Sequence, residues 1–328
     1  MFRTLFAFGC WLAVGCSPQP TERETLERDL QALADSAKAR VGIAAVLDEG
    51  DTLTIGNRAD YPLASVFKFH QALALLDSLD RTGASPALPI EVRRSDLLPD
   101  TWSPLRDARP DGGYALPLSE LLHYSIAQSD NNVCDLLFRF LGGPEYVERY
   151  IRGLGLADTA IAADEETMHR DPTTQYANTA SPLDVVRLLE RFRRGELLSP
   201  ASNDLLLTAM LATVTGPDKL KGLLPPDVRV AHKTGSGIRD AKGVVAADND
   251  AGMVFLPDGQ AYSIAVFIAD SHENDRTNAA VIASISERIY DYRLRHRPIK
   301  NDLQPGVVRA PVRASEIRRF SNPPRRPR

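Results

Sequence analysis

The pattern of apolar and polar residues predicts a helix and a strand pair near the beginning of the chain. Residues 21–40 place three leucines on one helical face and charges on the opposite face. Two apolar, β-branched runs follow at 41–47 and 52–55, and the turn sequence Asp-Glu-Gly-Asp separates them. We therefore expect a helix followed by a β-hairpin.

A second group of strands is predicted toward the other end of the chain. The runs 228–232, 251–256 and 262–269 are apolar, and the turn 257–260 joins the last two as a hairpin. An amphipathic pattern over 276–295 predicts a helix that follows these strands.

Between the two groups of strands the pattern is mainly helical. Helices are predicted at 65–79, within 118–141 and from 182 to about 194, where capping residues and apolar spacing agree. The segments 83–117 and 157–180 have the composition of loops.

The order of these elements predicts an α+β fold. Two early strands cannot bury a sheet face alone, so we expect one antiparallel sheet of five strands built from both ends of the chain. The terminal helices flank this sheet, and an all-α subdomain is inserted into it. We assign residues 21–60 and 216–297 to the sheet part and 61–215 to the helical part, with a cleft between the two parts.

The first residues resemble an export signal. The apolar run 5–14 follows Arg3 and is too short to span a bilayer. The small residues Ala13 and Gly15 precede Cys16, which fits a signal peptide of residues 1–15. Three interpretations stay open: a membrane-anchored lipoprotein acylated at Cys16, plain secretion, and a buried helix. Both export interpretations imply an oxidising compartment, and we expect the periplasm.

The end of the chain differs in charge from the rest. From residue 297 to 328 there are nine Lys or Arg against two acids, so this end carries +7 and the rest −11 of the net −4. Residues 298–328 also hold six prolines, which predicts a disordered basic tail beyond a catalytic domain of residues 16–297. The acidic body argues against nucleic acid as a partner.

The first of three short motifs that carry chemistry is Ser65-Val66-Phe67-Lys68. At a helix start, a serine and a lysine three positions apart share one face and can touch. A serine hydroxyl becomes an effective nucleophile when a neighbouring base takes its proton. The pattern alone is weak evidence, because chance produces it often.

The second motif is Ser129-Asp130-Asn131. The Ser129 hydroxyl could relay a proton to a leaving nitrogen, and the Asn131 amide could hold a substrate carbonyl and a lysine. Taken alone, such a cluster is typical of a helix cap.

The third motif, Lys233-Thr234-Gly235-Ser236, ends a predicted strand. Gly235 would let a ligand lie against the backbone, and Lys233 with the two hydroxyls would bind a carboxylate. Its ordinary interpretation is a strand end and a turn.

The three motifs together, in this order, resemble class A β-lactamases and penicillin-binding proteins, over about residues 21–296. The resemblance implies that Ser65 attacks the lactam carbonyl and that Ser129 passes a proton to the lactam nitrogen. It leaves open whether Lys68 or a loop glutamate activates Ser65. Asn131, Lys233, Thr234, Gly235 and Ser236 are implied to bind the substrate.

The loop 157–180 distinguishes among the members of this group. Glu165, Met168 and His169 match the Glu-x-x-Met-His pattern of an extended-spectrum subgroup of class A β-lactamases. On that register Glu165 is the base that activates the deacylating water, and Glu166 is its neighbour. His169 stands where most of the family has an asparagine.

Two further residues follow from the resemblance. Lys219 occupies the position of an auxiliary arginine that binds the substrate carboxylate, and Trp102 matches an aromatic residue at the cleft mouth. We expect a monomeric enzyme without cofactor or metal that hydrolyses β-lactam antibiotics and confers resistance. A D,D-peptidase or a non-catalytic penicillin sensor is the alternative.

Overall fold

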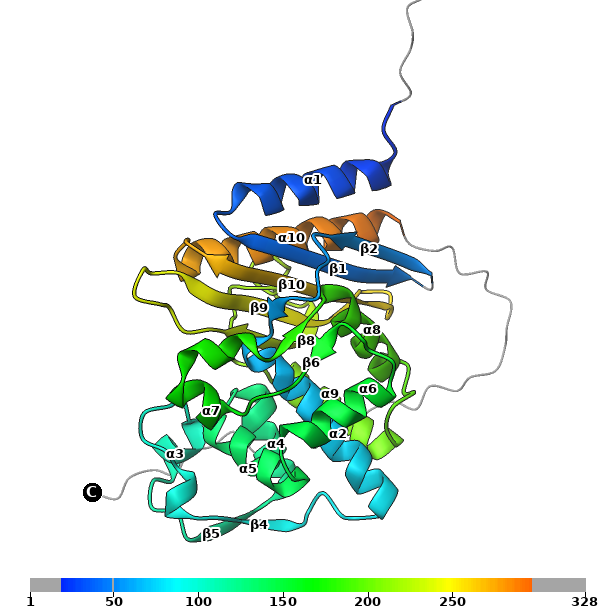
Figure 1. Ribbon diagram of the computed structural model, residues 1–328. Helices are drawn as coiled ribbons and strands as arrows, with labels where there is room; N and C mark the ends of the chain where they lie inside the picture. Colours follow the sequence, from blue (N-terminus) through cyan, green and yellow to red (C-terminus); the bar gives the residue numbers. More distant parts are fainter. Residues whose placement is uncertain (1–18, 49, 297–328) are drawn as a thin grey trace, which may run out of the picture. The chain divides into compact units, whose positions relative to one another are not determined.

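A computed structural model of the chain describes residues 19–48 and 50–296, so the predictions on the signal segment, Cys16 and the basic tail lie outside the described residues. One five-stranded antiparallel sheet has the order β2-β1-β10-β9-β8 (Figure 1). Its strands are β1 (Arg40–Asp48), β2 (Asp51–Ile55), β8 (Arg229–Ser236), β9 (Val245–Phe255) and β10 (Ala261–Ser271). The predicted sheet from both ends of the chain is confirmed, because β1 pairs with β10 from Arg40 opposite Ala269.

The two faces of the sheet bury different partners. Along β1, Ile43, Ala45 and Leu47 belong to one apolar core, whereas Ala44 and Val46 belong to the other. This alternation is the period-2 geometry of a strand that is covered on both faces. The helices α1 (Glu22–Ser36) and α10 (Asp275–Arg295) lie together over the first face, and the helical part lies against the second (Figure 1).

The helical part is inserted between β2 and β8. Its helices are α2 (Phe67–Thr82), α3 (Pro104–Ala108), α4 (Leu118–Ala127), α5 (Asn131–Leu141), α6 (Pro144–Gly153), α7 (Glu165–Arg170), α8 (Pro182–Arg193) and α9 (Pro200–Leu211). The buried α2 runs through the middle of this part (Figure 1). No helix within residues 19–48 and 50–296 is long and apolar enough to cross a membrane.

Two segments that the pattern assigned to loops contain short elements. The first holds α3 and the hairpin of β4 (Pro89–Val92) with β5 (Tyr114–Pro117). The second holds α7 and two strands of a small sheet made of β3 (Tyr61–Pro62), β6 (Thr159–Ala160) and β7 (Thr179–Ala180). Elements of two to six residues carry too few side chains to show a period, and tertiary contacts hold them in place.

Candidate active site

Ser65 and Lys68 lie at the start of α2, where a 3₁₀ turn over Ala64–Val66 leads into the helix. The Lys68 amine is fully buried and donates hydrogen bonds to Ser65 Oγ at 3.1 Å, the Ser129 carbonyl at 3.0 Å and Asn131 Oδ1 at 2.6 Å. It also forms an ion pair with Glu165 Oε1 at 2.8 Å. One buried cation therefore joins two of the motifs and the loop glutamate.

The charges around Ser65 indicate the direction of proton transfer. Burial favours the neutral Lys68 amine, but Glu165 together with the nearby Cys134 and Asp130 outweighs it, so the pKa of Lys68 lies above its ordinary value. Lys68 is thus protonated at neutral pH and donates to Ser65 Oγ. Ser65 in turn donates to Glu165 Oε1 at 3.2 Å, which makes Glu165 the acceptor in direct contact with the hydroxyl.

The second motif forms the connection between α4 and α5. Ser129 has a φ of 58°, a left-handed conformation that is uncommon for a residue with a side chain. Asp130 caps α5 by accepting from the Val133 N–H at 3.0 Å, and it also accepts from the Ser103 hydroxyl and the Leu105 N–H. Its capping role thus holds Ser129 and Asn131 in place beside Lys68.

The third motif brings β8 to the same point. Lys233 donates to Ser129 Oγ at 2.8 Å and to the Thr234 carbonyl at 2.9 Å. Burial, together with the charge of Lys68, lowers the pKa of Lys233 well below its ordinary value. The amine beside Ser129 therefore gives up its proton more readily than an exposed lysine, which suits a proton relay through Ser129.

Gly235 is required by the close approach of β8 to the nucleophile segment. A Cβ at this position would lie 2.5 Å from the Leu63 carbonyl oxygen and 3.2 Å from the Ser65 nitrogen. The neighbouring Asn249 on β9 holds the same segment, because its Nδ2 donates to the Pro62 and Leu63 carbonyls at 2.8 and 3.1 Å. The sheet thus fixes the backbone that leads into Ser65.

These residues surround a cavity of about 250 Å³. Side chains from all parts of the site line it, including Ser65, Trp102, Asn131, Glu165, His169 and Ser236. Trp102 is 60% exposed at the rim, and its indole N–H donates to the Gln128 carbonyl at 2.9 Å. The structure therefore brings the predicted residues of the three motifs and the loop together at one cleft.

The comparisons with known proteins agree with this geometry. The model of the beta-lactamase enzyme family matches residues 25–293. The chain belongs to this family.

A beta-lactamase of Bacteroides uniformis is 43% identical over 288 residues, which are 88% of this chain and 96% of that protein. The extended-spectrum beta-lactamase PER-1 of Pseudomonas aeruginosa is 39% identical, over 82% of this chain and 88% of that protein. The crystal structure of a representative class A beta-lactamase from Bacteroides cellulosilyticus superimposes with a TM-score of 0.81 at 44% identity, over 84% of this chain and 99% of that one. This chain is a class A serine β-lactamase, and the predicted function, hydrolysis of the β-lactam ring, is confirmed.

In this β-lactamase the loop places Glu165 toward Ser65 and Glu166 away from it. Asp164 caps α7 by accepting from the Thr167 N–H, so Glu165 begins the helix. The Glu166 side chain is 48% exposed and pairs with Arg170 at 3.3 Å. Of the two glutamates, Glu165 is thus the one in contact with Ser65.

Sequence analysis missed Asp135, which binds the backbone of the loop 157–180 at Glu165. Asp135 Oδ1 on α5 accepts from the Glu165 N–H at 2.8 Å. Burial, followed by the nearby Glu165 and Asp164 carboxylates, raises the pKa of Asp135 to about 8. The available signal was its spacing, because Asp135 lies four positions after Asn131 on the same helical face.

Asp135→Asn is expected to stabilise the β-lactamase increasingly as the pH rises. An unfolded aspartate ionises near pH 4, whereas Asp135 in the folded protein has a pKa of about 8. Between these two pH values the folded protein keeps a proton on Asp135 that the unfolded chain has lost. The free energy of unfolding of the wild type therefore falls as the pH rises from about 4 to about 8. The asparagine keeps an oxygen for the Glu165 N–H without this loss.

Melting curves at pH 5 and pH 8 measure this effect. The gap in Tm between variant and wild type should widen by at least about 3 °C at the higher pH. Asp204→Asn, at an exposed position of α9, is the control and should show a constant gap. A constant gap for Asp135→Asn would contradict the assignment.

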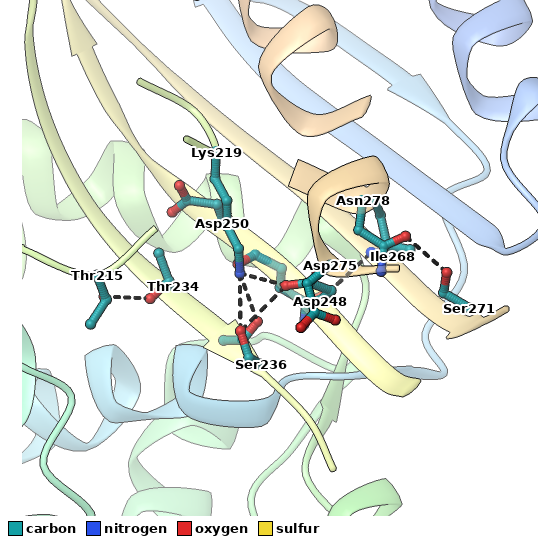
Figure 2. A network of polar contacts seen from close by, with 12 residues as sticks. Thr215, Lys219, Thr234, Ser236, Asp248, Asp250, Ile268, Ser271, Asp275 and Asn278 are labelled. Atoms are coloured by element: carbon teal, nitrogen blue, oxygen red, sulfur yellow. Dashed lines mark hydrogen bonds and ion pairs between the residues drawn. The ribbon is translucent and has the colours of Figure 1, made fainter. Parts of the chain in front are cut away.

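Lys219 does lie next to the third motif, as expected, but it has a partner that sequence analysis missed. Its amine donates to Ser236 Oγ at 3.1 Å and forms an ion pair with Asp248 Oδ1 at 2.5 Å (Figure 2). Asp248 lies in β9 opposite Ser236. The signal was hidden because Asp248, Asn249 and Asp250 interrupt the apolar run of β9, so the apolar pattern predicted the strand only from residue 251.

Proposed function

We propose that this β-lactamase acts through an acyl-enzyme on Ser65, with Glu165 as the base in both halves of the reaction. The contact that carries the proposal is the hydrogen bond from Ser65 Oγ to Glu165 Oε1 at 3.2 Å, beside a protonated Lys68. In acylation, Glu165 takes the Ser65 proton while Oγ attacks the lactam carbonyl. Glu165 then returns this proton through Lys68, Lys233 and Ser129 to the departing lactam nitrogen, so the carboxylate is free again. In deacylation it takes a proton from the water that attacks the ester, and that proton passes to Ser65 Oγ as the acyl bond breaks.

The other residues have roles that fit their positions. The backbone N–H groups of Ser65 and Ser236 would stabilise the oxyanion. Ser129 would pass a proton to the departing lactam nitrogen and recover one from Lys233, which contacts it at 2.8 Å. Thr234 and Ser236 would hold the substrate carboxylate.

The steady turnover of nitrocefin tests this function against both alternatives. A β-lactamase releases many product molecules per enzyme. A D,D-peptidase or a penicillin sensor would show a single burst and a stable adduct instead. Absence of steady turnover would overturn the proposal. Because one chain supplies every residue named here, we propose that the enzyme acts as a monomer.

We also propose that the enzyme is exported to the periplasm and anchored by an acylated Cys16. The short apolar run before Ala13-Val14-Gly15-Cys16 supports this, and the segment lies outside the described residues. The basic tail over 298–328 is likewise proposed from the sequence, and it also lies outside the described residues.

Cys16→Ala is expected to abolish lipid labelling. In cells grown with labelled palmitate, the label should be incorporated into the wild-type protein and not into the variant. The reason is that the acyl chains of the proposed anchor attach to Cys16. Cys134→Ala, which removes a buried thiol, is the control and should keep the label. Equal labelling of wild type and Cys16→Ala would exclude the anchor.

A further inference from the structure

A second cavity adjoins the active site. It measures about 370 Å³, and its lining includes Thr215, Lys219, Thr234, Arg239 and Asp248. Ser236 and Gly237, at the end of β8, line both this cavity and the one that contains Ser65. A substrate whose carboxylate lies against Ser236 therefore has its neighbouring substituent at the entrance of the second cavity.

Both cations in this cavity are already paired. Arg239 forms an ion pair with Asp275, which also lines the cavity. Lys219 and Asp248 are 7% and 5% exposed, and their charged atoms are 2.5 Å apart. The Lys219 amine also donates to Ser236 Oγ and, at 3.2 Å, to the Asn249 carbonyl (Figure 2). Because an ammonium group has three donors, these partners use all of them.

Ser236 is hydrogen-bonded to both members of the Lys219–Asp248 pair. Its hydroxyl accepts from Lys219 and donates to Asp248 Oδ1 at 3.3 Å. Its proton therefore points toward the protein's own carboxylate. A substrate carboxylate that approaches Ser236 competes with Asp248 for both groups, and water screens the repulsion little because Asp248 is buried. A cationic substituent at the same place is attracted to Asp248 instead.

We propose that Asp248 is a specificity-determining residue that favours cephalosporins with a cationic C3 substituent over those whose only charge is the carboxylate. The inference rests on the proposed function, since it concerns substrates that acylate Ser65. It differs from the simple expectation that Lys219 is a free binding group for the substrate carboxylate.

Two cephalosporins with the same acylamino side chain test the proposal. One carries a pyridiniomethyl group at C3 and is zwitterionic, and the other carries an acetoxymethyl group and is anionic. The readout is the ratio of kcat/KM for the zwitterion to that for the anion, which cancels any general loss of active enzyme. In Asp248→Asn this ratio should fall about tenfold, or about 1.4 kcal/mol, mainly through a lower KM for the anion.

A second variant should move the ratio in the opposite direction. Lys219→Met leaves the Asp248 charge unopposed, so the ratio should rise. The double variant Lys219→Met/Asp248→Asn removes both charges without leaving either one buried alone, and its ratio should lie below that of the wild type. Asp227→Asn, exposed before the opposite end of β8, is the control for net charge and should keep the ratio within about twofold.

Two failures are distinguishable. If the wild type hydrolyses both compounds and all variants keep its ratio within about twofold, Asp248 only positions Lys219 and this inference is wrong. If the wild type turns over nitrocefin but hydrolyses neither cephalosporin, this inference is wrong and the proposed function stands. If it turns over none of the three compounds, the proposed function is wrong as well.

Discussion

Glu165→Gln is expected to leave a drug adduct on Ser65 that persists for minutes or longer in intact-mass spectra. The glutamine keeps the shape of the side chain but cannot take a proton from the attacking water. Loss of a positioned general base slows a reaction by about 100- to 10,000-fold. Deacylation should slow by this factor, because no other carboxylate in the described part of the chain contacts Ser65 Oγ.

Acylation should survive in this variant because Lys68 can replace the missing base. The Glu165 charge is the largest of the influences that hold the pKa of Lys68 above its ordinary value against the effect of burial. Once this charge is removed, burial dominates and the amine can lose its proton. A neutral Lys68, 3.1 Å from Ser65 Oγ, can then accept the serine proton.

The neighbouring Glu166→Gln is the matched control for this experiment. Its exposed side chain pairs with Arg170, so the variant should turn over like the wild type and show no lasting adduct. If the two variants behave the other way round, the register of the loop is shifted by one residue. If neither accumulates an adduct, Glu165 does not limit deacylation.

Lys68→Met is expected to reduce acylation by nitrocefin by about 1,000-fold or more, near the upper end for loss of a proton-transfer group. The methionine fills the space but removes contacts to Ser65, Ser129 and Asn131 at once. It also leaves the Glu165 carboxylate, only 12% exposed, without its cation.

Stopped-flow measurement of the burst rate separates acylation from later steps. Lys242→Met, at an exposed turn position, removes the same charge and should keep the wild-type rate. An acylation rate within about tenfold of wild type would show that Lys68 is not needed to activate Ser65.

The fold was largely predictable because long periodic segments dominate it. The strand runs near both ends, the terminal helices and the predicted helices of the insertion carry a clear apolar pattern, whereas α6 and α9 were not predicted. The start of β9 was missed for a physical reason. Asp248, Asn249 and Asp250 are buried there, which an apolar pattern cannot show, and each is paired by a residue distant in sequence.

The residues of the candidate site likewise fall into those that the sequence predicts and those that it does not. Ser65, Ser129 and Lys233 belong to motifs whose chemistry can be recognised from residue type and spacing. Asp135 and Asp248 are single carboxylates, and their importance comes from contacts with Glu165 and Lys219. Such pairs depend on how α5 meets the loop and how β9 meets the segment before β8. The spacing of Asp135 from Asn131 places it on the right helical face, but it does not show the contact with Glu165.

The pairing of β1 with β10 has a consequence for how the protein folds. Arg40 lies opposite Ala269, so the central strands of the sheet come from segments separated by most of the chain. Contacts of such long range carry a high loop-closure entropy and slow folding. Until β10 has been synthesised, one edge of the apolar β1 has no partner, and exposed edges of this kind promote aggregation. A growing chain therefore cannot complete its sheet until most of its residues have been synthesised.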